Sequence, residues 1–317
     1  MTDVVAGVDI GGTNTVIGFV TRDGEVISEG RLSTADYAFA EDFVEAFSEK
    51  LAEMQGSMTD INMRGVGIGA PNANYHKGTI ELAPNLRWKG IVPLGDMIEK
   101  KTGLSVKLTN DANAAALGEM LFGAAKGMKD FIILTLGTGL GSGIVVDGEV
   151  VYGHTGFAGE LGHLTVVPGG RVCGCGRRGC LETYASATGL VRTALSLLSD
   201  RRDDSILRNM KSTEITSRRI AEAAAAGDVI AAEAMDQTAR MIAQGIANSV
   251  IFSSPEAVFL FGGLAQAGDA IIVPARKYAD EMVQPVFRGT FSILPSGLPE
   301  ARAAVLGASA LIWKEIK

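Results

Sequence analysis

The chain has 317 residues, of which 29 are Lys or Arg and 36 are Asp or Glu, so its formal charge is −7. A chain of this length can bury a large core without cross-links, and it exceeds the size at which one core usually divides. We therefore expect two lobes. The negative charge creates no overall positive field, so neither nucleic acid nor an anionic membrane is an expected partner.

The N-terminus, MTDVVAGVDI, has no basic stretch ahead of an apolar run, which argues against a signal peptide. A longer apolar run at 131–146, FIILTLGTGLGSGIVV, is interrupted by four glycines. It is also shorter than the roughly 20 residues that span a bilayer. These features predict a cytoplasmic protein.

The first part of the chain alternates strand and helix patterns. Its opening predicts an antiparallel meander, because three strand-like runs are separated by GGTN and by an Asp23-Gly24 hairpin signal. The elements that follow are a helix at 41–54, a strand at 64–71, a short helix at 93–103, a strand at 104–110 and a helix at 111–125. Asn110 and Asp111 are thus expected at a junction between strand and helix.

The segment 130–153 repeats the opening pattern of strand, glycine-rich turn, strand, hairpin and strand. Asp147-Gly148-Glu149-Val150 aligns with Asp23-Gly24-Glu25-Val26, which indicates an internal duplication. We expect two similar lobes that face each other across a cleft, each with a glycine turn able to bind phosphate. The rest is predicted to be largely helical at 183–253, with a strand at 256–263, helices at 268–282 and 301–313, and a solvated polar connection at 198–219.

The motif DIGGTN, from Asp9 to Asn14, follows a strand, and its glycines let backbone N–H groups approach an anion. A strand comes next, whereas the Walker A and dinucleotide motifs both open a helix. An ordinary tight hairpin is the alternative. The second copy, LGTGLGSG at 136–143, favours phosphate binding, and Asp9 would suit a Mg²⁺ ion directly or through water.

Asp111 has two interpretations. It can be the N-cap of its helix, a role that Asn110 could fill equally well. It can also be a catalytic base, because a carboxylate at the carboxyl end of a strand in an α/β sheet faces the region where ligands bind. Phosphorylation of an alcohol needs one such base. Position alone leaves both interpretations open.

The three cysteines of the chain all lie in CGCGRRGC. With His163 they complete a Cys₃His set, the ligand set of a closed tetrahedral Zn²⁺ site: His163, Cys173, Cys175 and Cys180. A glycine-rich loop with few apolar residues cannot order itself by burial, so a metal would order it. Glu160 and Glu182 flank these ligands and could accept hydrogen bonds from a polyol, or they could be surface acids.

These motifs together resemble the ROK family of sugar kinases and repressors, and within it the bacterial glucokinases. DIGGTN, LTNDANAAALGE, LTLGTGLGSGIVVDG, ELGH and CGCGRRGCLE occur in the order and spacing of that family. The resemblance covers essentially the whole chain. It implies the two-lobed, actin-like α/β fold of the sugar kinase ATPases, with duplicated ribonuclease H-like lobes. The lobes are expected at 1–115 plus 301–317 and at 116–300, the second with a zinc loop at 163–180.

The resemblance also implies roles for individual residues. Asp111 becomes the catalytic base for a sugar hydroxyl, expected to be the 6-hydroxyl. The implied sugar ligands are Asn85, Asn110, Asp111, Glu160, His163 and Glu182, with His163 also binding zinc. The implied ATP-binding residues, beside Asp9 for Mg²⁺, are Gly11, Gly12, Thr13, Asn14, Thr138, Gly139, Gly262 and Gly263. One departure is Asn72, where many members have glycine, and asparagine tolerates the left-handed conformation.

The resemblance therefore implies an ATP-dependent hexose kinase of glycolysis that acts on glucose, assembled as a homodimer or larger. Within the enzyme class, N-acetylmannosamine, N-acetylglucosamine, fructose or allose could replace glucose. ROK repressors share this body but carry an N-terminal winged helix, for which the first strand, beginning almost at Met1, leaves no room. A non-catalytic sugar sensor is the other alternative, and the intact Asp111 with both phosphate turns argues against it.

Overall fold

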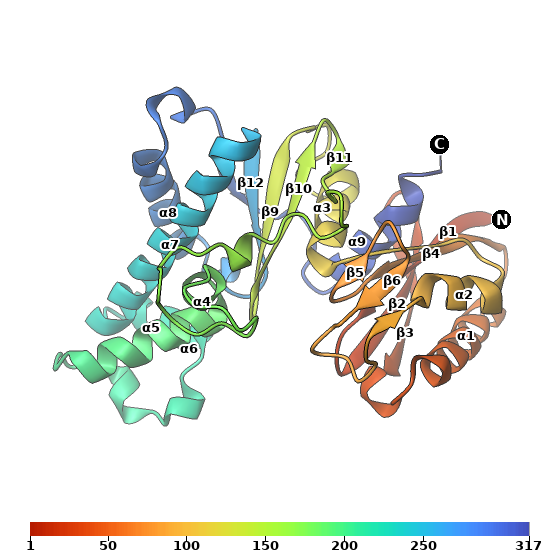
Figure 1. The fold of residues 1–317 in the computed structure, drawn as a ribbon, viewed down its shortest axis with the longest axis horizontal. Helices are drawn as coiled ribbons and strands as arrows, with labels where there is room; N and C mark the ends of the chain where they lie inside the picture. The colour runs from red at the N-terminus through yellow and green to blue at the C-terminus, as the bar shows by residue number, and fades with distance from the viewer. Residues whose placement is uncertain (317) are drawn as a thin grey trace. The chain divides into compact units, whose positions relative to one another are not determined.

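The computed structural model describes residues 1–316, which form two compact α/β units (Figure 1). The first unit contains Met1–Met128, Val150–Ala158 and the C-terminal segment from Gly297. The second contains Lys129–Glu149 and Gly159–Ser296. The boundary expected after residue 115 falls inside a helix that this division leaves whole in the first unit.

The first unit is built on a five-stranded sheet of order β3-β2-β1-β4-β8, in which β1, β2 and β3 form the predicted antiparallel meander and β4 and β8 run parallel to β1. A small three-stranded sheet, which the sequence did not predict, has the order β5-β6-β7. The strands are β1 (Thr2–Ile10), β2 (Asn14–Thr21), β3 (Val26–Ser33), β4 (Ile61–Gly69), β5 (Ala73–Asn74), β6 (Thr79–Glu81), β7 (Ile91–Val92) and β8 (Val106–Thr109). The helices are α1 (Ala40–Gly56), α2 (Leu94–Thr102), α3 (Asp111–Phe122) and α9 (Ala303–Trp313).

Alternating residues of β1 pack into two separate hydrophobic clusters, because successive side chains of a strand point to opposite faces of the sheet. Val4 and Val8 belong to the cluster that contains Phe43 and Phe47 of α1. On the other face, Val5 packs with Ile312 and Trp313 of α9. The C-terminal helix therefore returns to the N-terminal unit, as the family resemblance implied, and lies beside β1 and β4 (Figure 1).

Glycines let α9 approach the sheet closely. A Cβ atom on Gly7 or Gly67 would collide with the carbonyl oxygens of Val305 and Ala308, respectively. These strand residues must therefore lack a side chain for α9 to occupy its place.

The second unit repeats the topology of the first. Its five-stranded sheet has the order β11-β10-β9-β12-β13, with β10 antiparallel to β9, and β12 and β13 parallel to it, which agrees with the predicted duplication. The strands are β9 (Phe131–Leu136), β10 (Leu140–Val146), β11 (Glu149–Val150), β12 (Ala257–Phe261) and β13 (Ser292–Pro295). The helices are α4 (Glu182–Ala185), α5 (Ala187–Asp200), α6 (Ser217–Ala225), α7 (Val229–Ser253) and α8 (Asp269–Met282).

One hydrophobic cluster holds this second unit together. It joins Ile132 of β9 and Val258 of β12 to Ile242 and Ile246 of α7. Helices α5, α6 and α8 contribute to the same cluster, and Figure 1 shows them gathered around α7. The helical content predicted for 183–253 is thus confirmed.

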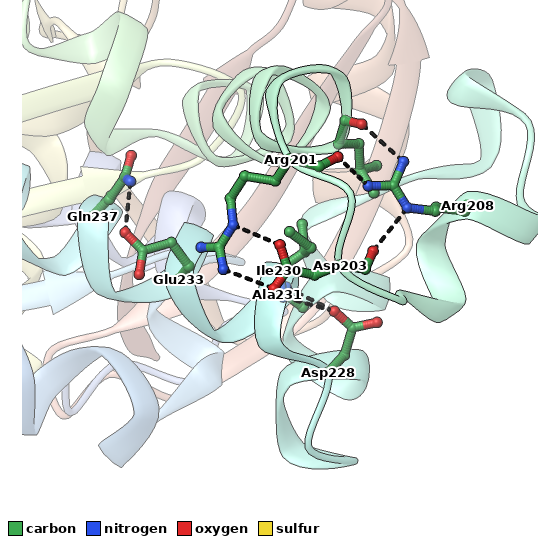
Figure 2. A network of polar contacts seen from close by, with 9 residues as sticks. Arg201, Asp203, Arg208, Asp228, Ile230, Ala231, Glu233 and Gln237 are labelled. Atoms are coloured by element: carbon green, nitrogen blue, oxygen red, sulfur yellow. Dashed lines mark hydrogen bonds and ion pairs between the residues drawn. The ribbon is translucent and has the colours of Figure 1, made fainter.

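The polar stretch between α5 and α6 is more ordered than the solvated connection that its charges predict. Figure 2 shows Arg208 donating hydrogen bonds to the carbonyl oxygens of Leu198, Arg201 and Asp203, at 2.8, 2.6 and 3.0 Å. Arg201 in turn forms two hydrogen bonds with the Asp203 carboxylate, at 2.9 and 3.0 Å. One arginine thereby satisfies three carbonyl groups at and beyond the end of α5.

Asp228 ties the same stretch to α7. One of its carboxylate oxygens caps α7 by accepting from the backbone N–H groups of Ile230 and Ala231, each at 3.0 Å (Figure 2). The other oxygen accepts from the Ser205 hydroxyl at 2.7 Å. Leu207, two residues after Ser205, is fully buried, so the predicted solvation does not hold for the whole stretch.

Helix α3 ends earlier than the pattern 111–125 predicts. Gly123 takes an extended conformation, and the Glu119 carboxylate accepts from the backbone N–H groups of Ala124 and Gly297, at 2.7 and 2.8 Å. The sequence also missed strand β13. Within residues 1–316, no helix combines the length and the apolar character needed to cross a membrane.

We predict that Gly67→Ala lowers the free energy of unfolding by about 2 kcal/mol or more, because α9 or the sheet must shift to admit the methyl group. Chemical denaturation measures the effect. Gly56→Ala is the matched control, since Gly56 has open space around it and ends α1, where alanine costs nothing. Equal stability of Gly67→Ala and the unmodified protein would contradict the close approach of α9.

Candidate functional site

In the first unit, the predicted site residues gather where three parallel strands end. Asp9 of β1 pairs with Gly69 of β4, and Gly69 pairs with Thr109 of β8. Since β8 leads directly into α3, Asp111 lies at the same edge of the sheet as Asp9. Pairing register thus brings together two carboxylates that are about one hundred residues apart in sequence.

The structure decides which of the two neighbouring residues caps α3. Asn110 is the N-cap, and its Oδ1 accepts from the backbone N–H of Asn113 at 2.7 Å. Asp111 is the first helical residue, and its Oδ1 accepts from the adjacent N–H of Ala112, at 2.9 Å. The cap therefore does not need the Asp111 carboxylate, which remains able to accept a proton from a ligand.

Both carboxylates have raised pKa values. Burial, together with the negative charge of Asp111, raises the pKa of Asp9 to about 6. Burial also raises the pKa of Asp111, although that residue as a whole remains exposed to water. Burial is the leading cause of both shifts, because it disfavours the charged form of a carboxyl group. Perturbed carboxyl groups of this kind are typical of functional sites.

The first glycine turn lies against the loop that contains Asn85. The N–H of Gly11 donates to the carbonyl of Asn14 at 2.9 Å, which closes the turn between β1 and β2. A Cβ atom on Gly12 would collide with the backbone carbonyl of Asn85. Two sequence-predicted residues, Gly12 and Asn85, are thus in contact, and Thr13 and Asn14 beside them are exposed.

In the second unit, two glycine-containing turns follow neighbouring parallel strands. Thr135 of β9 pairs with Phe261 of β12, so the turn at 137–139 and the Gly262-Gly263 turn lie at one edge of the sheet. Gly262 has a φ of 98°, and a Cβ atom there would lie 2.9 Å from the carbonyl oxygen of Leu136. Thr138 and Gly139 are therefore brought close to Gly262 and Gly263.

A cavity of about 530 Å³ adjoins the Gly262-Gly263 turn. Its walls include Gly263 and Gln266 on one side and Ser217, Arg218 and Glu222 of α6 on the other. The volume lies in the range of small-molecule sites. Sequence reasoning missed the α6 residues, because no local motif distinguishes this helix from other polar surface helices.

The four predicted metal ligands converge. Their ligand atoms, from His163, Cys173, Cys175 and Cys180, all lie within 4.8 Å of one another. The Sγ atoms of Cys175 and Cys180 are 3.7 Å apart, and so are Cys173 Sγ and His163 Nδ1. A tetrahedral site with bonds of about 2.3 Å to sulfur has edges of about 3.8 Å, so the cluster fits a metal of that geometry.

Metal binding at this cluster requires loss of thiol protons. Burial raises the pKa of the Cys173 thiol to about 12 while no ion is bound. The other two histidines lie outside the cluster. His76 Nε2 lies 2.8 Å from the carbonyl oxygen of Gly153, and His154 is exposed.

The two acidic residues that flank the cluster differ in their surroundings. Glu160 is exposed and precedes the short 3₁₀ helix Leu161–His163. Glu182 opens α4, and its Oε2 accepts from the N–H of Leu140 at 3.1 Å, while Oε1 lies 3.3 Å from Cys173 Sγ. Glu182 therefore contacts both the metal cluster and the end of the glycine turn at 137–139, which we call the second glycine turn. The sequence did not predict this link.

Residues 5–315 match the model of the ROK family. A glucokinase of Thermotoga maritima is 35% identical over 312 residues, which cover 98% of this chain and 97% of that protein. A ROK family glucokinase from Streptomyces griseus, solved with glucose and AMPPNP, has 35% identity and a TM-score of 0.80, with 97% and 98% of the two chains covered. A ROK family transcriptional regulator, a homologue of the E. coli MLC protein, has 28% identity and a TM-score of 0.88, with 99% of this chain and 78% of that one covered. These similarities confirm the predicted two-lobed α/β fold, and the chain belongs to the ROK family.

Proposed function

We propose that this protein transfers the terminal phosphoryl group of ATP to glucose, with Asp111 as the general base. The observation that carries the proposal is the place of Asp111. It opens α3 at the carboxyl end of β8, near a second carboxylate, while Asn110 supplies the helix cap. The similarity to ROK glucokinases over nearly the whole chain supports ATP and glucose as substrates.

In the proposed reaction, the Asp111 carboxylate accepts the proton of the sugar 6-hydroxyl, and the oxygen of that hydroxyl bonds to the terminal phosphorus of ATP. The bond from that phosphorus to the bridging oxygen breaks, and ADP leaves with the electron pair. A raised pKa makes Asp111 a better proton acceptor than an ordinary exposed carboxylate. Water exposure of the residue supports access of a substrate hydroxyl to it.

The remaining sugar contacts are proposed from the same motifs. Amide and carboxylate side chains suit a polyol, since they donate and accept hydrogen bonds in directions set by their backbone. In the first unit, the Nδ2 group of Asn110 makes no hydrogen bond within residues 1–316, which leaves it available as a donor. The proposed sugar ligands beside Asp111 are Asn85, Asn110, Glu160, His163 and Glu182.

Nucleotide binding is assigned to the three glycine-containing turns. Exposed backbone N–H groups in such turns bind phosphate oxygens without the obstruction of a side chain. The cavity between α6 and the Gly262-Gly263 turn has room for a nucleoside. The proposed residues are Gly11, Gly12, Thr13, Asn14, Thr138, Gly139, Gly262 and Gly263.

Asp9 is the proposed ligand for Mg²⁺, directly or through water. Two neighbouring carboxylates repel a triphosphate, and the pKa of Asp9 is raised first by burial and then by the negative charge of Asp111. Their hard oxygen atoms fit this cation. When bound, Mg²⁺ would neutralise charge on the phosphates, while Asp9 would hold it in place.

Zn²⁺ is the proposed occupant of the Cys₃His cluster, as a structural ion. Four ligands complete its tetrahedral coordination, so no position remains for a reacting water. Its expected effect is to order the loop 163–180 and thereby to hold His163 and Glu160. A homodimer or larger assembly is proposed on the family resemblance alone, and a cytoplasmic location on the sequence features described above.

The test of the proposed function is a coupled assay for ADP release with a panel of sugars. We expect turnover with ATP to be highest for glucose, and lower for fructose, allose, N-acetylglucosamine and N-acetylmannosamine. Inorganic polyphosphate in place of ATP tests the phosphoryl donor. An absence of turnover with every hexose, together with measurable glucose binding, would instead support a sugar sensor.

Asp111→Ala is expected to lower kcat by at least about 10² to 10⁴, since it removes the proton acceptor, while glucose binding is largely kept. Steady-state kinetics and calorimetric titration with glucose separate the two effects. Asp96→Ala is the matched control, because Asp96 is an exposed acid in the first turn of α2. Persistent turnover in Asp111→Ala would show that another residue is the base.

Metal analysis of the purified protein is expected to find about one zinc per chain. Removal of zinc with a chelator should make the loop 163–180 susceptible to proteolysis and raise KM for glucose more than KM for ATP. Cys175→Ala, which removes an exposed ligand, should reproduce both effects without a chelator. A fully active protein without metal would refute a structural role for the ion.

A further inference from the structure

The second glycine turn is held from one side by a single segment, Glu182–Thr188, which we call the support segment. Glu182 Oε2 accepts from the N–H of Leu140 at 3.1 Å. The N–H of Ala187 donates to the carbonyl of Gly137 at 2.9 Å. The Thr188 hydroxyl donates to the carbonyl of Thr138 at 2.6 Å. Three contacts from this segment thus reach the beginning, the middle and the end of the turn.

These contacts decide where the N–H groups of the turn point. In a planar trans peptide, the carbonyl and the following N–H point in opposite directions. The carbonyl of Thr138 points to Thr188, so the N–H of Gly139 points away from the support segment. By the same argument, the bond from Ala187 to Gly137 turns the N–H of Thr138 away as well.

Those two N–H groups are the ones a phosphate would need. Within residues 1–316, neither the N–H of Thr138 nor that of Gly139 has a hydrogen-bond partner, and Thr138 is exposed. Glycine at 139 is also required sterically, because a Cβ atom there would collide with the Glu182 carboxylate. The turn is therefore packed closely on one side and has unpaired donors on the other.

The support segment is itself firmly held. Its Ser186 is buried and caps α5 by accepting from the N–H of Gly189 at 3.0 Å. Arg171 donates to the carbonyl of Thr183 at 2.8 Å, and its guanidinium lies 4.5 Å from the centre of the Tyr184 ring. A segment fixed in this way can hold a turn whose glycines would otherwise sample many conformations.

We propose that Thr188 is a positioning residue for the phosphoryl donor: its hydroxyl holds the Thr138 carbonyl so that the N–H of Gly139 is directed at a phosphate oxygen. The inference rests on the proposed function, in which this turn binds ATP. Thr188 need not touch the nucleotide. It acts by reducing the conformational freedom that the turn would lose on binding.

The test is Thr188→Val, which keeps the shape of the side chain and removes its hydroxyl. Thr188 is exposed and Ser186 supplies the helix cap, so the variant should fold. The Thr188 hydroxyl also lies 3.0 Å from the hydroxyl of buried Ser186, and thermal denaturation checks that loss of this contact leaves the fold intact. We expect the Kd for MgADP, measured by calorimetry, and KM for ATP to rise about fivefold, the effect of one neutral hydrogen bond. KM for glucose should not change.

Two further variants make the outcome specific. Thr188→Ser keeps the hydroxyl and should bind MgADP as the unmodified protein does. Thr290→Val is the matched control, because this exposed threonine also donates to a backbone carbonyl, that of Phe287 at 2.9 Å, but in a loop away from the turn. It should leave the Kd for MgADP unchanged.

The inference is overturned if Thr188→Val binds MgADP normally, if Thr188→Ser is equally impaired, or if KM for glucose rises by the same factor. Failure of the proposed function would look different. In that case the unmodified protein itself would neither bind MgADP nor phosphorylate a sugar.

Discussion

The alignment of parallel strand ends is the constraint on which the rest of this structure depends. Backbone pairing places the last residues of β1, β4 and β8 side by side, and so brings Asp9 near Asp111. The second unit uses the same strand order, and there the pairing of β9 with β12 brings two glycine turns together. In both units, the residues with proposed chemical roles lie at the carboxyl edge of a sheet, because side chains there are not covered by the next strand.

A second theme is that a capping residue lies close to two residues with proposed roles, Asp111 and Thr188. Asn110 caps α3, which frees the Asp111 carboxylate. Ser186 caps α5, which frees the Thr188 hydroxyl to reach the turn. A helix N-terminus needs only one side-chain cap, so the neighbouring polar residue can serve a ligand or another loop without loss of helix stability.

The metal cluster and Glu182 add a different kind of order. The loop that carries the cysteines is rich in glycine and has little apolar surface to bury, which is why we propose that a metal ion orders it. Glu182 extends that order to the second glycine turn through its contacts with Cys173 and Leu140. The loop is therefore connected to both the proposed sugar ligands and the proposed phosphate turn.

Local patterns in the sequence were sufficient for the two meanders, most helices and the Cys₃His set, because hydrophobic period, turn residues and ligand spacing are properties of short segments. The return of the last helix was implied only by the family resemblance. They were not sufficient for the end of α3, for β13 or for the cavity beside α6, each of which depends on partners far along the chain. Sequence could not choose between Asn110 and Asp111 as the cap either, since both residue types cap helices well. Only the structure decided that choice, by fixing the point at which β8 ends and α3 begins. It also decided the direction of the Thr138 carbonyl, because the hydrogen bond from the distant Thr188 selects one of several conformations that the glycine-rich turn permits.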